Sequence, residues 1–350
     1  MKVAIKRSAT VIGEDGRVGG HDAGATLVRR FLRLFPESQL IGPAPRRCDG
    51  FDVVPIEFVD PSDTVIINMD VLDSTEIWNT IFRESGGESA RIMNFVWWPA
   101  ADLESKIEKP TMALSCVLFP TFANSERTAS EIKELTRKLT VSSLSEQAKL
   151  AWVNLGFRLD HVREHVKTEV PVVLYPAIYL SERKRPALFR RVVEKVHAKT
   201  PIKVEMRLQE SHLVSEKAMS FSQIPWVWVG PLTAERASYW EALAHTTAFL
   251  ATADEESYGL SYVEAMGAGA IGIFPNMEWA KTLVPADYPF LYDTEEEAVK
   301  LLTRAVEDPD SCQSELDSLT GGSFAEWINK HHSDDAFDRE VVSAVNNWFS

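Results

Sequence analysis

The sequence contains few cysteines and no long apolar run. Its 350 residues include 3 cysteines, Cys48, Cys116 and Cys312, which lie far apart and form no C-x-x-C pair. This pattern argues against a disulfide framework or a zinc cluster and favours a reducing compartment, so we expect a cytoplasmic location. No segment approaches the roughly 18 consecutive apolar residues of a membrane-spanning helix. The opening segment, Met1–Lys6, predicts a strand and is too short for a signal peptide.

Positive charge is also scarce, because 37 Lys and Arg residues stand against 51 Asp and Glu residues, for a net charge of −14. An acidic surface repels nucleic acid and anionic lipid at long range, so neither is an expected partner. The P-loop, H-E-x-x-H and G-x-S-x-G motifs are absent as well. Their absence removes three common catalytic frameworks.

The composition, with 45% apolar and 25% charged residues, is that of a folded protein, and the length suits two domains. Short apolar strands alternate with amphipathic helices, which predicts an α/β protein made of two doubly wound parallel sheets. The polar stretch Glu164–Pro171 separates the two runs. We therefore expect domains at 1–167 and 168–325, followed by a tail, 326–350, whose apolar spacing is compatible with a helix that crosses back to the first domain.

Apolar runs and their spacing place the individual elements. Strands are expected at Val3–Lys6, Val53–Val59, Thr64–Asn68, Ile92–Trp98, Leu114–Phe119, Val170–Tyr175, Ile202–Leu208, Trp226–Val229, Ala248–Ala251, Ala270–Phe274 and Phe290–Tyr292. Helices are expected at Ala23–Phe35, Ala129–Leu139, Ala187–Ala198, Ala234–Ala244, Tyr262–Met266 and Glu295–Val306.

The segment Ala248–Pro275 carries the most information about function. It begins with a strand, turns through acidic residues, and passes Gly259 into a helix, with Glu256 before the glycine and Glu264 inside the helix. A helix N-terminus offers unpaired N–H groups and partial positive charge to a diphosphate, and a glycine lets the backbone approach the ligand. Ligands of open α/β sheets collect at the carboxyl ends of strands, which is where this loop belongs.

This pattern, E-x7-E with Tyr258-Gly259-Leu260 inside it and E-A-M-G-A-G after it, resembles the signature of retaining GT-B glycosyltransferases. The usual text of that family is E-G-F-G-L-x-x-x-E-A-M-A-x-G. Ser257 and Tyr258 replace the common Gly and Phe, and Gly267 replaces the common Ala. The resemblance implies two Rossmann-like domains facing across a cleft. The alternative is a plain loop-to-helix connection with surface acids.

The resemblance also implies roles for the residues of the signature. Glu256 is expected to bind the donor sugar at the catalytic step, and Glu264 is expected to bind the ribose of the nucleotide. The backbone from Tyr258 through Gly259 and Leu260 to Ser261 is expected to hold the sugar and phosphate.

A glycine-rich turn, Gly19-Gly20-His21, follows the first strand and precedes a helix. In the family that the signature resembles, such a turn faces the donor phosphates. His21 is a candidate contact to the acceptor, although a structural histidine accounts for it equally well, and glycine pairs often only make turns.

The cation that neutralises the diphosphate is not obvious. The family usually has an Arg just after the first strand of the second domain and a Lys a few residues later. Here Ile178 stands in the place of that Arg, Arg183 or Lys184 falls where the Lys belongs, and Arg207 at the end of the next strand is a substitute. A solvated helix start is the alternative reading of Arg183 and Lys184.

Two further groups lie in the first half of the chain. Trp97 and Trp98 follow a strand and are acceptor-side candidates, since Trp stacks on sugar faces, although a Trp in such a position is more often simply core. Asp70 and Asp73 resemble a metal-binding pair, but the family resembled here holds its diphosphate with helix and side-chain charges, so no metal is expected.

The sequence therefore predicts a glycosyltransferase, a hexosyltransferase by resemblance, that moves a sugar from a nucleotide-sugar donor to an unidentified acceptor with retention of anomeric configuration. The donor is a co-substrate and no cofactor is expected. UDP-, GDP- and ADP-sugars all stay open, as do the oligomeric state and attachment to a membrane surface. The alternatives are a sugar-nucleotide epimerase and a non-catalytic nucleotide-sugar-binding relative, the latter favoured by Ile178.

Overall fold

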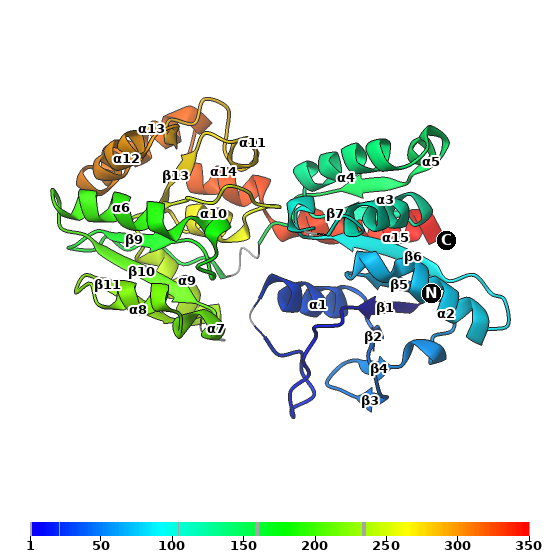
Figure 1. Ribbon diagram of the computed structural model, residues 1–350. Coiled ribbons are helices and arrows are strands. Elements are labelled where there is room, and N and C mark those ends of the chain that lie inside the picture. Colours follow the sequence, from blue (N-terminus) through cyan, green and yellow to red (C-terminus); the bar gives the residue numbers. More distant parts are fainter. Residues whose placement is uncertain (1, 21, 104, 158–160, 233–235, 350) are drawn as a thin grey trace. The chain divides into compact units, whose positions relative to one another are not determined.

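The protein is described by a computed structural model covering residues 2–20, 22–103, 105–157, 161–232 and 236–349 (Figure 1). The chain divides into two compact α/β units. Unit 1 comprises Met1–Asn154 and Ala336–Ser350, and unit 2 comprises Leu155–Asp335. The division lies ahead of the expected boundary at 167/168, because the backbone of Phe157 pairs with residues of unit 2.

Unit 1 is built on an eight-stranded sheet with the order β3-β4-β2-β1-β5-β6-β7-β8. Neighbouring strands are parallel except for β3 and β4. The strands are β1 (Lys2–Lys6), β2 (Gln39–Ile41), β3 (Arg46–Arg47), β4 (Asp52–Val54), β5 (Thr64–Asn68), β6 (Arg91–Val96), β7 (Thr121–Ala123) and β8 (Leu150–Trp152). The order reverses between β1 and β5, so their carboxyl ends form the switch point of this unit.

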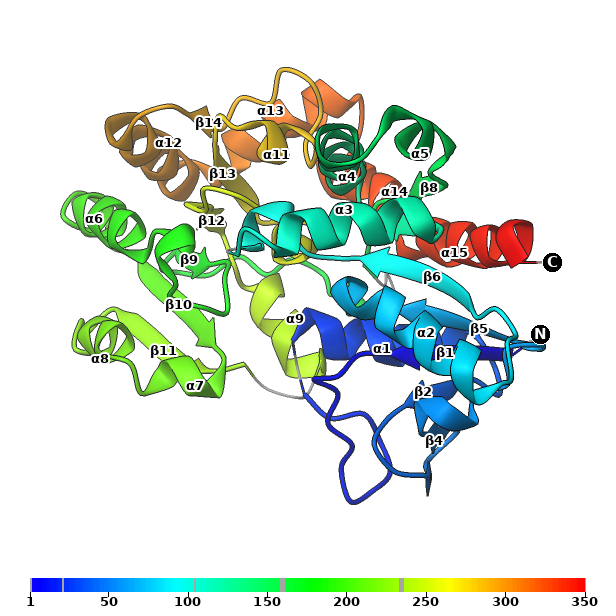
Figure 2. The same ribbon diagram turned by 45° about the vertical axis from the view of Figure 1, so that its right-hand side comes forward.

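Helices cover both faces of the unit 1 sheet. Successive side chains of a strand point to opposite faces, so one strand packs against helices on both sides. Ile92 of β6 packs with α2, which lies in front of β1 and β5 in Figure 2. Phe95 of the same strand faces the opposite side and contacts α1 through Phe31, with ring centroids 5.0 Å apart. The helices of this unit are α1 (Ala23–Leu34), α2 (Ser74–Glu84), α3 (Glu108–Leu118), α4 (Glu126–Leu139), α5 (Ser142–Gln147) and α15 (Asp334–Phe349).

The C-terminal helix α15 completes the core of unit 1. Phe337 is fully buried, and its ring lies 5.8 Å from that of Phe95 and 6.2 Å from that of Phe122. The Arg30 guanidinium lies 4.0 Å from the Phe337 ring centroid and donates to Asp338 at 2.7 Å. The last residues of the chain are therefore part of the first unit, whereas α14 belongs to the second.

Unit 2 is built on a six-stranded parallel sheet with the order β11-β10-β9-β12-β13-β14. The strands are β9 (Val172–Tyr175), β10 (Lys203–Leu208), β11 (Val227–Pro231), β12 (Ala248–Leu250), β13 (Ile271–Pro275) and β14 (Leu291–Tyr292). In chain order within the unit this is the 3-2-1-4-5-6 arrangement of a Rossmann sheet. The order reverses between β9 and β12, which are paired neighbours. The loops that follow these two strands are therefore where a ligand is expected.

The helices of unit 2 are α6 (Pro186–His197), α7 (Glu210–Leu213), α8 (Glu216–Ser222), α9 (Arg236–Ala244), α10 (Leu260–Gly267), α11 (Glu278–Lys281), α12 (Glu295–Glu307), α13 (Pro309–Thr320) and α14 (Phe324–His331). Most of them lie between its strands, and α12, α13 and α14 follow the last strand. The start of α12 shows how the sequence sets a boundary. The Thr294 hydroxyl accepts from the Glu297 N–H, and the Glu297 carboxylate accepts from the Thr294 N–H, which closes a capping box.

Two of the expected strands are wrong. Leu114–Phe119 is the end of α3, because Met112 and Cys116, one helical turn apart, are buried in the same core cluster. Val53–Val59 is strand only as far as Val54, where Pro55 ends it and a 3-10 turn, Ile56–Phe58, follows. Both errors come from short apolar runs, whose length alone does not separate strand from helix.

Candidate functional site

The loops after β9 and β12 are joined to each other at the switch point of unit 2. The Thr252 hydroxyl donates to the backbone oxygen of Lys184 at 2.7 Å, and the Asp254 N–H donates to that of Arg183 at 2.9 Å. The Ser261 hydroxyl at the start of α10 donates to the Pro176 oxygen at 2.7 Å. These bonds hold the signature loop against the first loop of the unit.

Lys184 and Glu256 form an ion pair at this junction, and both side chains are largely buried, with 21% and 15% exposed. The Tyr262 hydroxyl donates to Oε1 of Glu256 at 2.7 Å. Burial, together with the charge of Glu256, raises the pKa of Tyr262 well above its usual value, so this hydroxyl stays protonated and remains a donor. Glu256 thus contacts one cation, Lys184, and one neutral donor, the Tyr262 hydroxyl.

Gly259 starts α10 in a conformation that a side chain would disrupt. Its φ is +89°, in the left-handed region, and a Cβ here would lie 2.6 Å from the Tyr262 ring. Leu260 and Ser261 follow as the first residues of the helix and are partly buried. The glycine therefore allows Tyr262 to reach back toward Glu256.

Glu264 lies deeper than Glu256. Its residue is 3% exposed, and its Oε2 accepts from the Tyr239 hydroxyl at 2.9 Å. The two carboxylates of the signature are on the same loop–helix segment, and each accepts from a tyrosine, but Glu256 also contacts a lysine and is less deeply buried.

The side chain of Tyr258 faces the interior of the unit. It is 4% exposed, and its hydroxyl lies 2.8 Å from Nδ1 of His332. The side chain of Tyr258 is therefore directed away from the surface, and its role toward a donor stays a prediction.

The cations considered from the sequence fall in different places. Lys184 contacts Glu256, whereas Arg183 is exposed and contributes its backbone oxygen to the loop junction. Arg207 pairs with Glu205 and stacks 5.2 Å from the Trp228 ring centroid, so the structure groups it with β10 and β11. Ile178 is partly buried, and its backbone oxygen accepts from the Gln209 N–H at 3.0 Å.

In unit 1, the glycine turn precedes α1. Gly19 donates its N–H to Val11 at 2.9 Å, and the Gly20 oxygen accepts from Arg29 at 2.8 Å. His21 lies outside the described residues. Arg7 is a cation at the switch point of unit 1 that the sequence analysis does not single out. It follows β1 and binds the α1 cap residue Asp22 at 2.8 Å. Its position directly after the first strand is the sequence feature that marks it.

The tryptophans of unit 1 differ in their surroundings. Trp97 is partly buried with the Arg7 guanidinium 5.7 Å from its ring centroid, whereas Trp98 packs against the core cluster of α3 and α4. Trp98 is thus a packing residue, and Trp97 is the one beside a cation.

Asp70 and Asp73 both bind the Lys6 ammonium, at 2.8 and 2.9 Å. Burial lowers the pKa of Lys6, but the hydrogen bonds and charges of the two aspartates outweigh burial and raise it. Lys6 therefore stays charged and occupies the position between the two carboxylates. Within the described ranges, no group of three or more His, Cys, Asp or Glu side chains is arranged to hold a metal ion.

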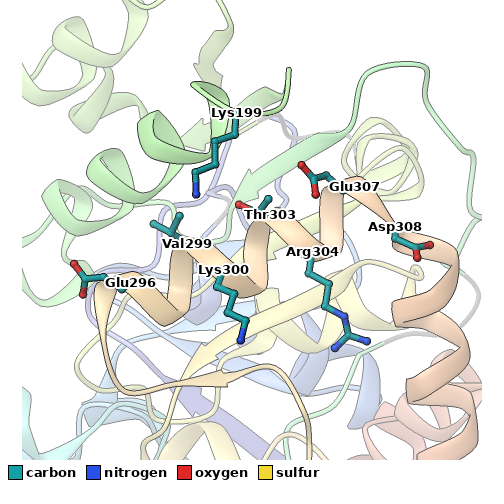
Figure 3. A pocket seen from close by; sticks show the side chains of 8 residues that line it. All are labelled: Lys199, Glu296, Val299, Lys300, Thr303, Arg304, Glu307 and Asp308. Carbon is teal, nitrogen blue, oxygen red and sulfur yellow. The ribbon is translucent and has the colours of Figure 1, made fainter.

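A separate surface pocket of about 360 Å³ lies over α12. Figure 3 shows Lys199, just after α6, reaching toward this helix, where Thr303 lies on the face nearest to it. The lining mixes cations such as Lys300 with acids such as Glu296, so it presents no single charge to a ligand. None of the described residues that the sequence singled out lines it.

Two α/β units, each with a mainly parallel sheet between helices, form the GT-B fold. Neither a family model nor a curated protein matches the sequence. Solved structures of glycosyltransferases do match over almost the whole chain.

Three of these structures illustrate the likeness. Sucrose-phosphate synthase from Thermosynechococcus elongatus is 10% identical, with 99% of both chains covered and a TM-score of 0.70. Anabaena HepE, solved in complex with UDP and glucose, is 12% identical, with 99% of both chains covered and a TM-score of 0.70. Trehalose-6-phosphate synthase OtsA is 9% identical, with 99% of both covered and a TM-score of 0.71. At these identities the likeness establishes the fold.

No helix among the described residues is both long and apolar enough to cross a membrane.

Proposed function

We propose that this chain is a glycosyltransferase that moves a sugar from a nucleotide-sugar donor to an acceptor with retention of anomeric configuration. The observation that carries the proposal is the Lys184–Glu256 pair, which lies at the switch point of unit 2 immediately before Gly259 and α10. A cation, a carboxylate and a helix start at one strand junction match what a sugar diphosphate requires.

Each of these groups receives a task in the proposal. The N–H groups at the start of α10 and the Lys184 ammonium bind the diphosphate, and Glu264 binds the ribose. Glu256 accepts hydrogen bonds from the hydroxyls of the donor sugar. An ammonium has three donors, so Lys184 is able to bind Glu256 and a phosphate oxygen together. As the sugar–phosphate bond breaks, negative charge grows on the leaving diphosphate, and a cation already in place stabilises it.

The choice of donor follows from a structural neighbour. The HepE structure contains UDP and glucose. We therefore propose UDP-sugars as the first donors to test, with GDP- and ADP-sugars beside them.

A thermal-shift screen tests this proposal. A ligand that binds only the folded state stabilises it in proportion to the logarithm of its saturation. One of the three nucleotide-sugar series should raise Tm progressively with concentration, and Lys184→Ala should reduce that shift. The proposal fails if no nucleoside diphosphate or nucleotide sugar changes Tm at millimolar concentration.

Retention is tested separately by the configuration of the released sugar. UDP-glucose carries an α-linked glucose, so a retaining enzyme transfers it to water as α-glucose. Proton NMR recorded before the anomers equilibrate should show α-glucose first, and β-glucose first would identify an inverting enzyme.

A further inference from the structure

The two segments that connect the units are paired with each other inside unit 2. The chain leaves unit 1 after Asn154 and returns to it at Ala336. Between these points the Phe157 N–H donates to the His332 oxygen at 2.8 Å, and the Asp334 N–H donates to the Phe157 oxygen at 3.1 Å. Phe157 and Ser333 form a parallel bridge. We name residues 155–157 and 332–335 the connecting pair.

The His332 side chain joins the connecting pair to the signature loop. Its Nε2 lies 3.1 Å from the Leu283 oxygen, which can only accept, so Nε2 carries the proton. In the neutral ring Nδ1 is then the acceptor for the Tyr258 hydroxyl at 2.8 Å. His332 is 2% exposed, and burial lowers its pKa to about 4, so the ring is neutral near pH 7.

The other end of the signature also contacts the connecting pair. A Cβ at Gly267 would lie 2.4 Å from Cζ of Phe157 and 2.8 Å from Oδ1 of Asn329, so a side chain does not fit there. Both positions depart from the usual text of the family that the signature resembles. Tyr258 adds a hydroxyl where that text has Phe, and Gly267 removes a methyl where it has Ala. Each departure allows a contact with the connecting pair: the Tyr258 hydroxyl bonds to His332, and the missing methyl of Gly267 leaves room for the Phe157 ring.

We propose that the Tyr258–His332 hydrogen bond couples the donor loop to the connecting pair, with Tyr258 and His332 as positioning residues. Ordering of the donor loop by a nucleotide then also orders the backbone through which unit 2 joins unit 1. The part of this inference that concerns a nucleotide rests on the proposed function, whereas the coupling between the two segments does not.

Hydrogen exchange on the full chain without ligand tests the coupling itself. Tyr258→Phe removes the hydroxyl and keeps the ring. The matched control is Tyr288→Phe, because Tyr288 is also 4% exposed and donates to the Gly272 oxygen at 2.9 Å, away from the connecting pair. We expect Tyr258→Phe to speed exchange of the Phe157 and Asp334 amides by roughly three- to ten-fold, and Tyr288→Phe to leave them unchanged. Equal rates in wild type and Tyr258→Phe overturn the coupling.

Nucleotide then tests the functional part. UDP should slow exchange at Phe157 and Asp334 in the wild type and much less in Tyr258→Phe, while the loop around Glu256 is protected in both. In donor turnover, Tyr258→Phe should raise KM by roughly five-fold and change kcat by less than about two-fold, because only loop ordering is lost. Equal slowing by UDP in both proteins contradicts the coupling. A wild type that ignores nucleotide but retains the ligand-free exchange difference refutes the proposed function and leaves the coupling intact.

Discussion

Lys184 and Glu256 are bonded to each other although they lie in loops that leave different strands, β9 and β12. Those strands are hydrogen-bonded neighbours at the point where the strand order of unit 2 reverses. The cation and the carboxylate of the proposed donor site are therefore positioned by one strand pair, and a change in either side chain should be felt by the other.

Removing the cation should weaken nucleotide binding. Lys184→Ala deletes a charge-assisted contact worth roughly 1.5–3 kcal/mol, so calorimetry should show a ten- to hundred-fold loss of affinity for the nucleoside diphosphate. Arg207→Ala is the matched control, since Arg207 is held by Glu205 and Trp228. A larger loss in Arg207→Ala or Arg183→Ala than in Lys184→Ala would place the phosphate elsewhere.

The two carboxylates of the signature should separate in their effects. Glu264→Gln should weaken binding of both the free nucleoside diphosphate and the whole donor. Glu256→Gln should leave nucleoside-diphosphate affinity nearly intact and lower kcat, because sugar contacts matter most when they tighten in the transition state. Nucleotide calorimetry and donor turnover on both variants check this division. Equal loss of nucleotide affinity in the two variants would rule it out.

Tyr262 should assist Glu256 without contacting the nucleotide. Tyr262→Phe removes the hydroxyl that donates to Oε1 of Glu256 and keeps the buried ring. A hydrogen bond to a charged carboxylate is worth roughly 1.5–3 kcal/mol, so kcat should fall by roughly ten-fold or more with nucleotide affinity unchanged. Tyr288→Phe supplies the control for loss of a buried tyrosine hydroxyl. If the two variants lose kcat equally, Tyr262 has no specific part in holding Glu256.

His332 should make the protein less stable in acid. Burial, the largest cause, lowers its pKa from 6.5 to about 4 in the folded state. Between these values the unfolded chain binds a proton that the native state does not, so the free energy of unfolding falls as pH drops from 6.5 to 4. The contribution lost by pH 4 is about 3 kcal/mol. Urea unfolding of wild type and His332→Gln at several pH values measures it.

The stability difference between wild type and His332→Gln should shrink as the pH falls, because glutamine does not titrate. Tyr258→Phe retains the histidine and should keep the acid dependence of the wild type. A difference between wild type and His332→Gln that is constant from pH 7 to pH 4 would mean that the ring is not held neutral by burial.

The sequence indicates the fold and the signature loop well because both depend on local patterns. Thr64–Asn68 is a buried strand with the apolar centre Val65–Ile67, and Gly259 with its flanking glutamates marks a strand–loop–helix connection that the structure contains. The short apolar run Leu114–Phe119 predicts a strand, but the segment is the end of α3. The burial of Met112 and Cys116 in one core cluster, one helical turn apart, is what distinguishes it as helix.

Residues brought together over long distances in the chain were beyond the reach of the sequence. The sequence offers three cations for the diphosphate, and only the fold shows that Lys184 is the one that contacts Glu256. The local backbone there is irregular, since the 3-10 turn Glu182–Lys184 ends at Arg185 in a left-handed conformation with φ of 47°. The partner of Tyr258 is His332, far along the chain, and no spacing rule connects them. The roles of Glu256, Glu264 and Lys184 toward a donor stay predictions.

The most direct test of the account is release of nucleoside diphosphate from nucleotide sugars by the wild type and by Glu256→Gln, without an added acceptor. We predict that the wild type slowly transfers sugar to water and forms the diphosphate from one donor series. Glu256→Gln should form it at a small fraction of that rate while still binding the nucleotide. A wild type that binds the donor tightly and releases no diphosphate, with or without acceptors, would contradict the account and identify a binding protein with a GT-B fold.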